Sequence, residues 1–310
     1  MSTAMTLRGL SRNTRWALIG GAVLLLSGLG NGSWFAGLLG AALLIGAGWT
    51  LYTAAQDKRD LERPWPWPPD FRALAEGMAR PIDPTPKRVL PPDEKTAMIA
   101  AVATTDDALA RLIADKPPAW PWAVFASVLL QRRNAAQNRL RRCVSGYQPR
   151  AGSAALSGQA YSQLAYRTMN QIADLVAQLE QFMLSPAFTG ALNVPGDESA
   201  ADPGAIVGVA NRLMDYHDEF LTQAETCLQS PVEPDVRTFV QDMGAFTLCP
   251  LVGYQQFITT MCARVGEAQD LLPYTRGGQV VALDDATLTI SLPDGLTERI
   301  VAHTKSFNGS

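Results

Sequence analysis

Charged residues are scarce in this chain: Asp, Glu, Lys and Arg make up 18% of its 310 residues, whereas about a quarter is usual in soluble proteins. Residues 16–55 contain none of them and no histidine. Such a stretch is not expected in an ordinary soluble protein. Four cysteines without regular spacing exclude a disulfide scaffold, and the lack of a glycine period excludes a collagen-like chain.

The motifs of common catalytic and metal sites are also missing. The sequence contains no HExxH, no GxSxG, no phosphate-binding glycine loop and no CxxC pair, and its two histidines lie 86 residues apart. The sequence therefore predicts no catalytic residue, no cofactor and no metal site. We expect the cysteines to be buried free thiols.

The uncharged stretch of residues 16–55 predicts two membrane-spanning helices. It is about twice as long as the ~20 residues that one span needs, and Asn31-Gly32-Ser33 supplies a turn in it. Basic residues on both sides favour a multi-pass protein of the bacterial inner membrane with both termini in the cytoplasm. A cleaved signal peptide is the alternative, but no Ala-x-Ala-like site closes the first apolar run.

Aromatic rings near the predicted spans favour the headgroup layer of a bilayer. The predicted interfacial anchors are Trp16, Trp34, Trp49, Tyr52, Trp65 and Trp67. The last two lie in residues 56–92, a segment rich in proline and tryptophan that we interpret as a juxtamembrane linker. It follows a cytoplasmic tail of residues 1–15 and the hairpin of residues 16–55, and it precedes a cytosolic helical domain of residues 93–310.

Charge is divided unevenly along the chain. Residues 116–173 contain eight basic residues and no acid, whereas residues 174–310 contain six basic residues and 18 acids. This division indicates either a basic surface that meets something anionic or two segments that meet each other. For the first case the sequence predicts a surface for anionic lipid, made of Arg132, Arg133, Arg139, Arg141 and Arg142 with Trp120 and Trp122 before them. Without a recognised motif, no nucleic-acid partner is expected.

Apolar periodicity predicts a mainly helical fold after residue 92. We expect a first helix over residues 93–114 and an interfacial or core helix over 119–130, which is too short to span a bilayer. Seven-residue periodicity predicts three further helices, and another fills the gap before the last of them. Their ranges are 161–182, 202–228, 251–272 and 234–248. Asp202 is the expected N-cap of the second.

The tail of the chain changes its pattern. Residues 280–283 and 287–292 alternate like short strands, and a final helix follows over residues 296–306. The predicted fold is therefore an N-terminal two-helix transmembrane hairpin plus a cytosolic antiparallel helical bundle with a small C-terminal β-hairpin.

Two functions of different classes fit this organisation. The first is a membrane-anchored helical interaction or scaffold protein, whose partners are the lipid bilayer and an unidentified protein or a second copy of the chain. The alternative is a membrane-tethered enzyme with a site between the bundle helices and the long loop of residues 186–203.

His217 is the histidine closest to a cluster of acids, yet we expect it to be structural. The residues three and four positions away on its helix are all apolar: Leu213, Met214, Phe220 and Leu221. The neighbouring acids point to other directions of the helix and cannot serve as its partners on that face.

Overall fold

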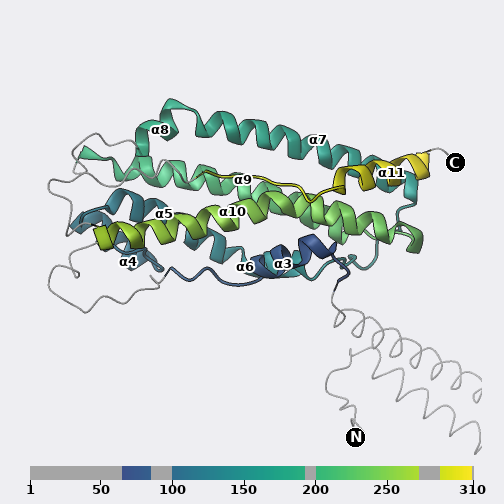
Figure 1. Cartoon of the computed structure of the whole chain (residues 1–310), viewed down its shortest axis with the longest axis horizontal. Helices are drawn as coiled ribbons and strands as arrows, with labels where there is room; N and C mark the ends of the chain where they lie inside the picture. The colour runs from purple at the N-terminus through teal and green to yellow at the C-terminus, as the bar shows by residue number, and fades with distance from the viewer. Residues whose placement is uncertain (1–64, 85–99, 193–199, 272–286, 309–310) are drawn as a thin grey trace, which may run out of the picture. The chain divides into compact units, whose positions relative to one another are not determined.

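The computed structural model describes residues 65–84, 100–192, 200–271 and 287–308 of the chain (Figure 1). The chain divides into two compact units, residues 1–64 and Trp65–Ser310. The predicted tail of residues 1–15, the predicted hairpin of residues 16–55 and the anchors Trp16, Trp34, Trp49 and Tyr52 lie outside the described residues. The second unit begins at Trp65, before the predicted start at residue 93.

The described residues of the second unit form helices and contain no β-strand. The elements are α3 (Pro69–Met78), α4 (Asp106–Asp115), α5 (Trp120–Ala135), α6 (Gln137–Val144), α7 (Gly158–Met183), α8 (Pro186–Leu192), α9 (Pro203–Gln229), the 3₁₀ turn η4 (Pro234–Val236), α10 (Arg237–Leu271) and α11 (Leu296–Asn308). The predicted helical bundle is confirmed.

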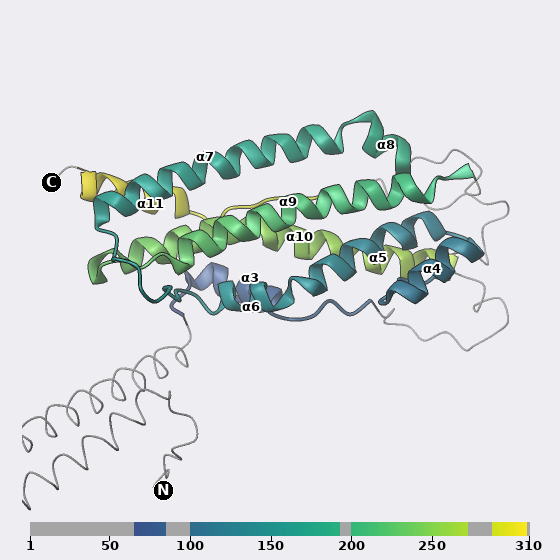
Figure 2. The same cartoon turned by 180° about the vertical axis from the view of Figure 1, so that it is seen from behind.

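Helix α9 lies at the centre of the bundle. It packs against α5 and α10, against α7 and α8, and against α6. Figures 1 and 2 show α7 along one edge of the bundle and α3 and α6 along the other, with α11 beside the start of α7. Helices α5, α9 and α10 also contact one another, so these three helices enclose the middle of the core.

The predicted seven-residue stripes are the buried faces of α7 and α9. Ser157 caps α7 by accepting a hydrogen bond from the backbone N–H of Ala160, and Asp202 caps α9 by accepting one from Gly204 at 2.8 Å, as predicted. The stripe of α7 is buried from Tyr161 to Leu179. The buried stripe of α9 consists of Ile206, Ala210, Leu213, His217, Phe220, Ala224 and Leu228.

The two helices predicted for residues 234–248 and 251–272 are a single helix, α10, with Pro250 inside it. Proline has no N–H to donate to the carbonyl of Phe246, which normally ends or kinks a helix. Burial on both sides of the proline outweighs this loss, since Leu248, Leu251 and Tyr254 are each at most 1% exposed. Tyr254 also donates a hydrogen bond to the backbone carbonyl of Leu213 in α9, at 2.9 Å.

The proline- and tryptophan-rich segment from Trp65 is packed on the bundle. The indole N–H of Trp67 donates to the carbonyl of Val144 at 2.8 Å, and Trp67 is only 5% exposed. The ring of Trp65 lies so close to Gly146 that a Cβ there would come within 2.2 Å of it. The prediction that Trp65 and Trp67 anchor the chain in a lipid interface is therefore corrected: both rings pack against the protein.

The helix predicted for residues 93–114 begins later. Thr105 caps α4 by accepting from the N–H of Ala108, and residues 100–104 are not helical. The backbone N–H of Ala103 instead donates to Ser127 Oγ of α5 at 2.7 Å. This bond holds the preceding segment extended against α5, which the helical pattern could not indicate. Residues 93–99 lie outside the described part.

The C-terminal β-hairpin is also corrected. Its first predicted strand, residues 280–283, lies outside the described residues, and residues 287–292 are extended without strand pairing. Leu288 and Ile290 pack against the core, and the carbonyl of Thr289 lies where a Cβ on Gly253 of α10 would be. The alternating pattern thus reflects an extended segment that lies on a helix.

The predicted localisation, a multi-pass protein of the inner membrane with both termini in the cytoplasm, is overturned. Across residues 65–84, 100–192, 200–271 and 287–308, no helix combines the length and the apolar character needed to cross a membrane. The physical reason is that long helices such as α7 bury one stripe and expose polar residues, including Gln171 and Asp174, on the other face.

We expect Ile172→Asp to destabilise the bundle by more than about 3 kcal/mol, because it places an unpaired charge on the buried stripe of α7. Ile172 is 5% exposed, whereas its neighbour Gln171 is exposed. Gln171→Asp should change the stability by less than about 0.5 kcal/mol. Denaturant unfolding of the full chain, followed by circular dichroism, measures both. Equal stability of the two variants would show that the stripe is not core.

Candidate interaction site

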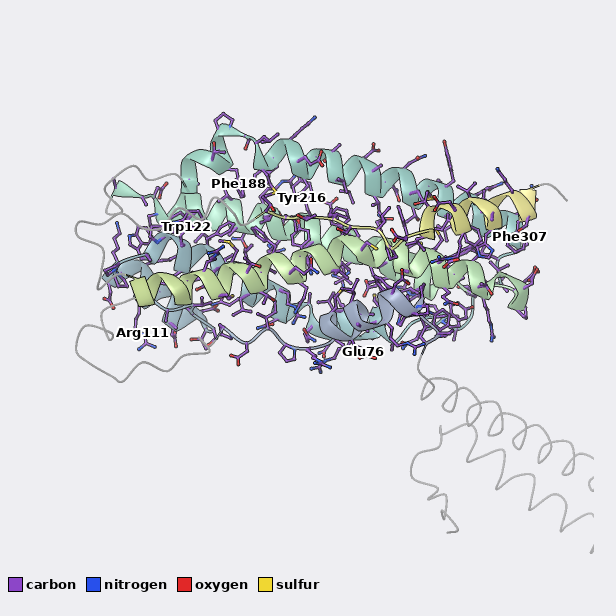
Figure 3. The ribbon with its side chains drawn as sticks, viewed as in Figure 1. Glu76, Arg111, Trp122, Phe188, Tyr216 and Phe307 are labelled. Atoms are coloured by element: carbon purple, nitrogen blue, oxygen red, sulfur yellow. The ribbon has the colours of Figure 1, made fainter. Side chains whose placement is uncertain are left out.

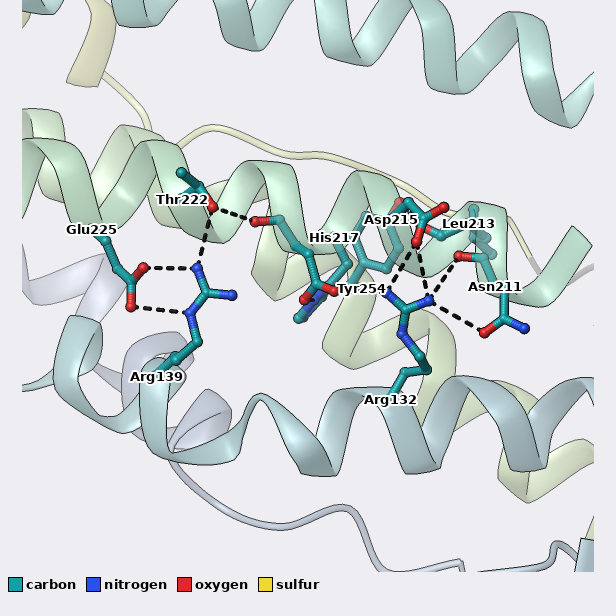
Figure 4. Close-up of polar contacts among 10 residues, drawn as sticks. Arg132, Arg139, Asn211, Leu213, Asp215, His217, Thr222, Glu225 and Tyr254 are labelled. Atoms are coloured by element: carbon teal, nitrogen blue, oxygen red, sulfur yellow. Dashed lines mark hydrogen bonds and ion pairs between the residues drawn. The ribbon is translucent and has the colours of Figure 1, made fainter. Parts of the chain in front are cut away.

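Basic residues of α5 and α6 form ion pairs with acidic residues of α9 (Figure 4). We call this set of contacts the charged seam; it joins Arg132, Arg139 and Arg142 to Asp215, Asp218 and Glu225. Arg132 Nη2 lies 3.0 Å from Asp215 Oδ1 and 2.7 Å from Asp218 Oδ2. Its Nη1 also donates to Asn211 Oδ1 at 3.2 Å. One guanidinium therefore joins three side chains on successive turns of α9.

A second cluster lies two helical turns further along the seam. Arg139 donates to both carboxylate oxygens of Glu225, at 3.1 and 2.7 Å, and to Thr222 at 3.2 Å. Arg142 approaches the same carboxylate at 3.6 Å. The sequence left two interpretations of the divided charge, a basic surface for something anionic or two segments that contact each other. For these arginines the second is confirmed, because they contact the acids of α9.

The other predicted lipid-surface residues lie in different surroundings. Arg133 and Trp120 are each 1% exposed, so they cannot meet a lipid surface in this fold. Trp122 is half-buried against Phe125, with ring centroids 6.5 Å apart. Arg141 is exposed. The attraction of anionic lipid stays a prediction, and Arg141 and Arg142 are the arginines of the set most open to solvent.

Arg133 stabilises the end of α3 from inside the bundle. Its Nη2 donates to the carbonyls of Met78 and Arg80, at 2.8 and 2.7 Å, and Gln137 donates to that of Ala79 at 2.7 Å. Burial lowers the pKa of Arg133 to about 10, so it stays charged at neutral pH. A cation at a helix C-terminus is favourable, and it occupies carbonyls that the helix leaves open.

The acids of the seam are held in their charged form. Hydrogen bonds from Arg139 lower the pKa of Glu225, against the opposing effect of burial. Burial alone would raise the pKa of Asp218, but Arg132 and His217 beside it outweigh this effect and the pKa is lowered. Both carboxylates therefore contribute to stability at neutral pH, and this contribution is lost as the pH falls below their ordinary pKa values, near 4.

His217 points into the core. It is 1% exposed, and its ring packs edge-on against Tyr254 with centroids 5.3 Å apart. Its Nδ1 lies 3.5 Å from Asp218 Oδ1 but makes no hydrogen bond among the described residues. Burial lowers the pKa of His217, and the nearby carboxylate opposes this only in part. The ring is therefore neutral at physiological pH, as the structural interpretation requires.

The loop predicted for residues 186–203 begins with α8. Phe188 of α8, labelled in Figure 3, lies on this segment. Its ring packs edge-on against Phe125 and Phe182, with centroids 6.1 and 5.4 Å away. The enzyme alternative placed a site between this loop and the bundle, but the described beginning of the loop is filled by these rings. Residues 193–199 lie outside the described part.

The cysteines are free and buried, as predicted. Burial raises the pKa of Cys143, Cys249 and Cys262 to about 12 and that of Cys227 to about 11. At neutral pH these thiols are protonated and are poor nucleophiles. Among the described residues, no group of His, Cys, Asp and Glu side chains could hold a metal ion.

An open groove of about 520 Å³ lies between α7 and α11. Its lining residues are Ser162, Gln163, Tyr166, Arg167 and Thr304. The volume falls within the ~300–1,000 Å³ typical of ligand pockets. Tyr166 is 66% exposed, an unusual position for a large aromatic side chain.

Helix α11 is held against the bundle by a buried carboxylate. Asp242 of α10, 4% exposed, accepts hydrogen bonds from Arg299 Nε at 3.1 Å and interacts with His303 Nε2 at 3.2 Å. Figure 3 shows Phe307 at the far end of α11. Its ring lies on Gly158, where a Cβ would come within 2.0 Å of it. The wall of the groove that α11 supplies is thereby fixed at both ends.

The sequence did not identify this groove, because its two walls are far apart in the chain. The spacing of the seven-residue stripe does place Tyr166 and Arg167 outside the buried face of α7. This spacing is the sequence feature that could have indicated an exposed aromatic residue beside an arginine. Comparison with protein-family models, with curated proteins and with solved structures finds no match. The function must therefore be inferred from the residues themselves.

Arg132→Gln should lower the stability by about 1 kcal/mol, since it leaves Asp215 and Asp218 near each other without their shared cation. Arg142→Gln is the matched control, because its contact with Glu225 is longer and more exposed, and we expect a change below about 0.5 kcal/mol. Denaturant unfolding at low and at 1 M salt measures both. The loss of stability caused by Arg132→Gln should be smaller at 1 M salt. Equal losses of stability in the two variants would show that the ion pairs of Arg132 do not stabilise the bundle.

His217→Gln should cost about 1 to 3 kcal/mol at pH 7.5, because it loses the ring contact with Tyr254 and buries an amide. It should also flatten the pH dependence. The unfolded chain binds a proton at the ordinary histidine pKa of about 6.5, and the buried ring binds it only at lower pH. The stability that the native chain gains from keeping His217 neutral is therefore fully present above about pH 6.5, and it is lost as the pH falls below that value.

Unfolding of the native chain and of His217→Gln between pH 7.5 and 5 measures this difference. The interval lies above the range in which Asp218 and Glu225 titrate, so their contributions stay constant. An unchanged slope in His217→Gln would show that the histidine is not buried in its neutral form.

Proposed function

We propose that this chain is a helical interaction protein whose bundle binds a protein partner through the face formed by α7 and α11. The observation that carries this proposal is the groove beside Tyr166, whose ring is 66% exposed. Tyrosine is enriched at protein interfaces, where it supplies a large apolar area and a polar tip at a small cost in side-chain entropy.

Further apolar surface supports the same face. Val301 of α11 is 41% exposed. It lies three residues before Thr304, a spacing that places both on the same side of the helix. The α11 side of the face thus combines an apolar and a hydroxyl group, which is the mixture found at binding surfaces for other proteins.

The face is also rigid before any partner binds. The inner side of α7 is buried along its stripe, and α11 is held by Asp242 and by the packing of Phe307 on Gly158. A preformed surface loses little conformational freedom on binding, so more of its contact energy remains as affinity.

Site-specific photo-crosslinking tests the proposal. A photoreactive phenylalanine analogue at position 166 of the full chain, expressed in the cells that make the protein, should give one discrete crosslinked species. Val301→Glu in the same chain should reduce its yield severalfold, because a charge then lies on the apolar part of the face.

The same analogue at position 178 is the control, since Gln178 is also exposed on α7 but does not line the groove. Crosslinking of the same species at both positions, or no crosslink at position 166, would contradict the proposal. A species with twice the mass of the chain identifies the partner as a second copy.

A further inference from the structure

Arg167 is an exposed arginine of α7 whose hydrogen-bonding partner lies in its own helix. Its Nε donates to the carbonyl of Gln163 in its own helix, at 3.3 Å, and no carboxylate of the described residues forms an ion pair with it. The positions three and four residues away are Gln163, Leu164, Asn170 and Gln171. Helix neighbours at these spacings are the usual partners of a surface arginine, and here none is charged.

Arg111 of α4 is a comparable exposed arginine that has acidic residues beside it on its helix. It is exposed and donates in the same way to the carbonyl of Asp107, also at 3.3 Å. Acids occupy both positions four residues away, Asp107 and Asp115. The two arginines thus match in geometry and differ in the charge around them.

The groove beside Arg167 contributes no negative charge either. None of its lining residues is acidic, and Lys305 follows Thr304 on the exposed side of α11. The hydroxyls of Ser162 and Thr304 donate to the carbonyls of Gly158 and Ile300, both at 2.9 Å. Ser162 is only 2% exposed, so the Thr304 oxygen is the acceptor open to a ligand. The groove therefore offers a cation, an aromatic ring and an acceptor for an N–H group.

We propose that the groove between α7 and α11 binds an acidic peptide segment of the partner, with a carboxylate of that segment paired with Arg167. This inference rests on the proposed interaction function and names its chemistry. A peptide matches each group of the site: its carboxylate pairs with the guanidinium, a backbone N–H reaches the hydroxyl oxygen of Thr304, and its apolar side chains cover Tyr166. The open shape of the groove suits a chain that passes through it.

Peptide binding to the full-length chain tests the inference. The probes are fluorescein-labelled twelve-residue peptides in which leucine alternates with glutamate, with glutamine or with lysine, and fluorescence anisotropy reports their binding. A nonionic detergent in all samples keeps the uncharged residues 16–55 in solution without adding charge. The glutamate peptide should bind more tightly than the glutamine peptide, and the difference should fade as salt rises from 0.05 to 0.5 M.

Arg167→Gln should weaken binding of the glutamate peptide about fivefold, the effect of one exposed ion pair, and should leave the glutamine peptide unaffected. Arg167→Glu should reverse the preference in favour of the lysine peptide. Arg111→Gln is the matched control, with an expected change below about 1.5-fold. Arg167 is exposed, so these variants should keep the melting temperature of the native chain.

Equal binding of the glutamate peptide by the native chain and by Arg167→Gln would overturn the inference, as would an equal loss in Arg111→Gln. The crosslink at position 166 separates this failure from failure of the proposed function. If the crosslinked species forms as well in Arg167→Gln as in the native chain, a partner binds the face but not through an acidic segment. If no species forms at all, the interaction function itself is wrong.

Discussion

Helix α9 imposes the constraint on which the rest of the bundle depends. Its apolar residues are not confined to one narrow stripe: beside the seven-residue series, Val209, Met214, Tyr216, Leu221 and Cys227 are also buried. A helix that is apolar over most of its circumference must be covered on several sides. Helices α5, α10 and α7 supply that cover, so the order of the bundle follows from the composition of one element.

The acidic side of α9 faces α5 and α6, and this accounts for part of the division of charge along the chain. A segment without acids and a segment rich in acids each carry an unfavourable net charge alone. Packed together, Arg132 and Arg139 satisfy Asp215, Asp218 and Glu225 at the edge of the core. The contacts are partly exposed, so each contributes little to stability, but they set which face of α5 lies against α9.

The sequence predicts those parts of the fold that depend on the pattern of apolar residues along a single helix. The stripes of α7 and α9 and the cap at Asp202 follow from spacing alone. Contacts between distant segments could not be predicted in this way. Nothing near Thr289 indicates that its carbonyl packs on Gly253, and nothing near Gly158 indicates that Phe307 covers it. The groove was missed for the same reason, because one of its walls depends on that last contact.

Most arginines of the segment without acids bind a distant part of the chain, whereas Arg167 binds a carbonyl of its own helix. Each needs a partner from elsewhere in the chain, and most find one: Arg132, Arg139 and Arg142 bind acids of α9, Arg133 and Arg141 bind carbonyls at the end of α3, and Arg150 binds the amide of Gln229. These residues lie on the side of the molecule where α5 and α6 pack or at the connection that leads to α7. Arg167 lies on α7 itself, at the edge of the bundle, where α11 contributes the hydroxyl of Thr304 to the groove. An arginine whose described partner is a carbonyl of its own helix is thus located at the groove between α7 and α11, where the chain also exposes an aromatic ring.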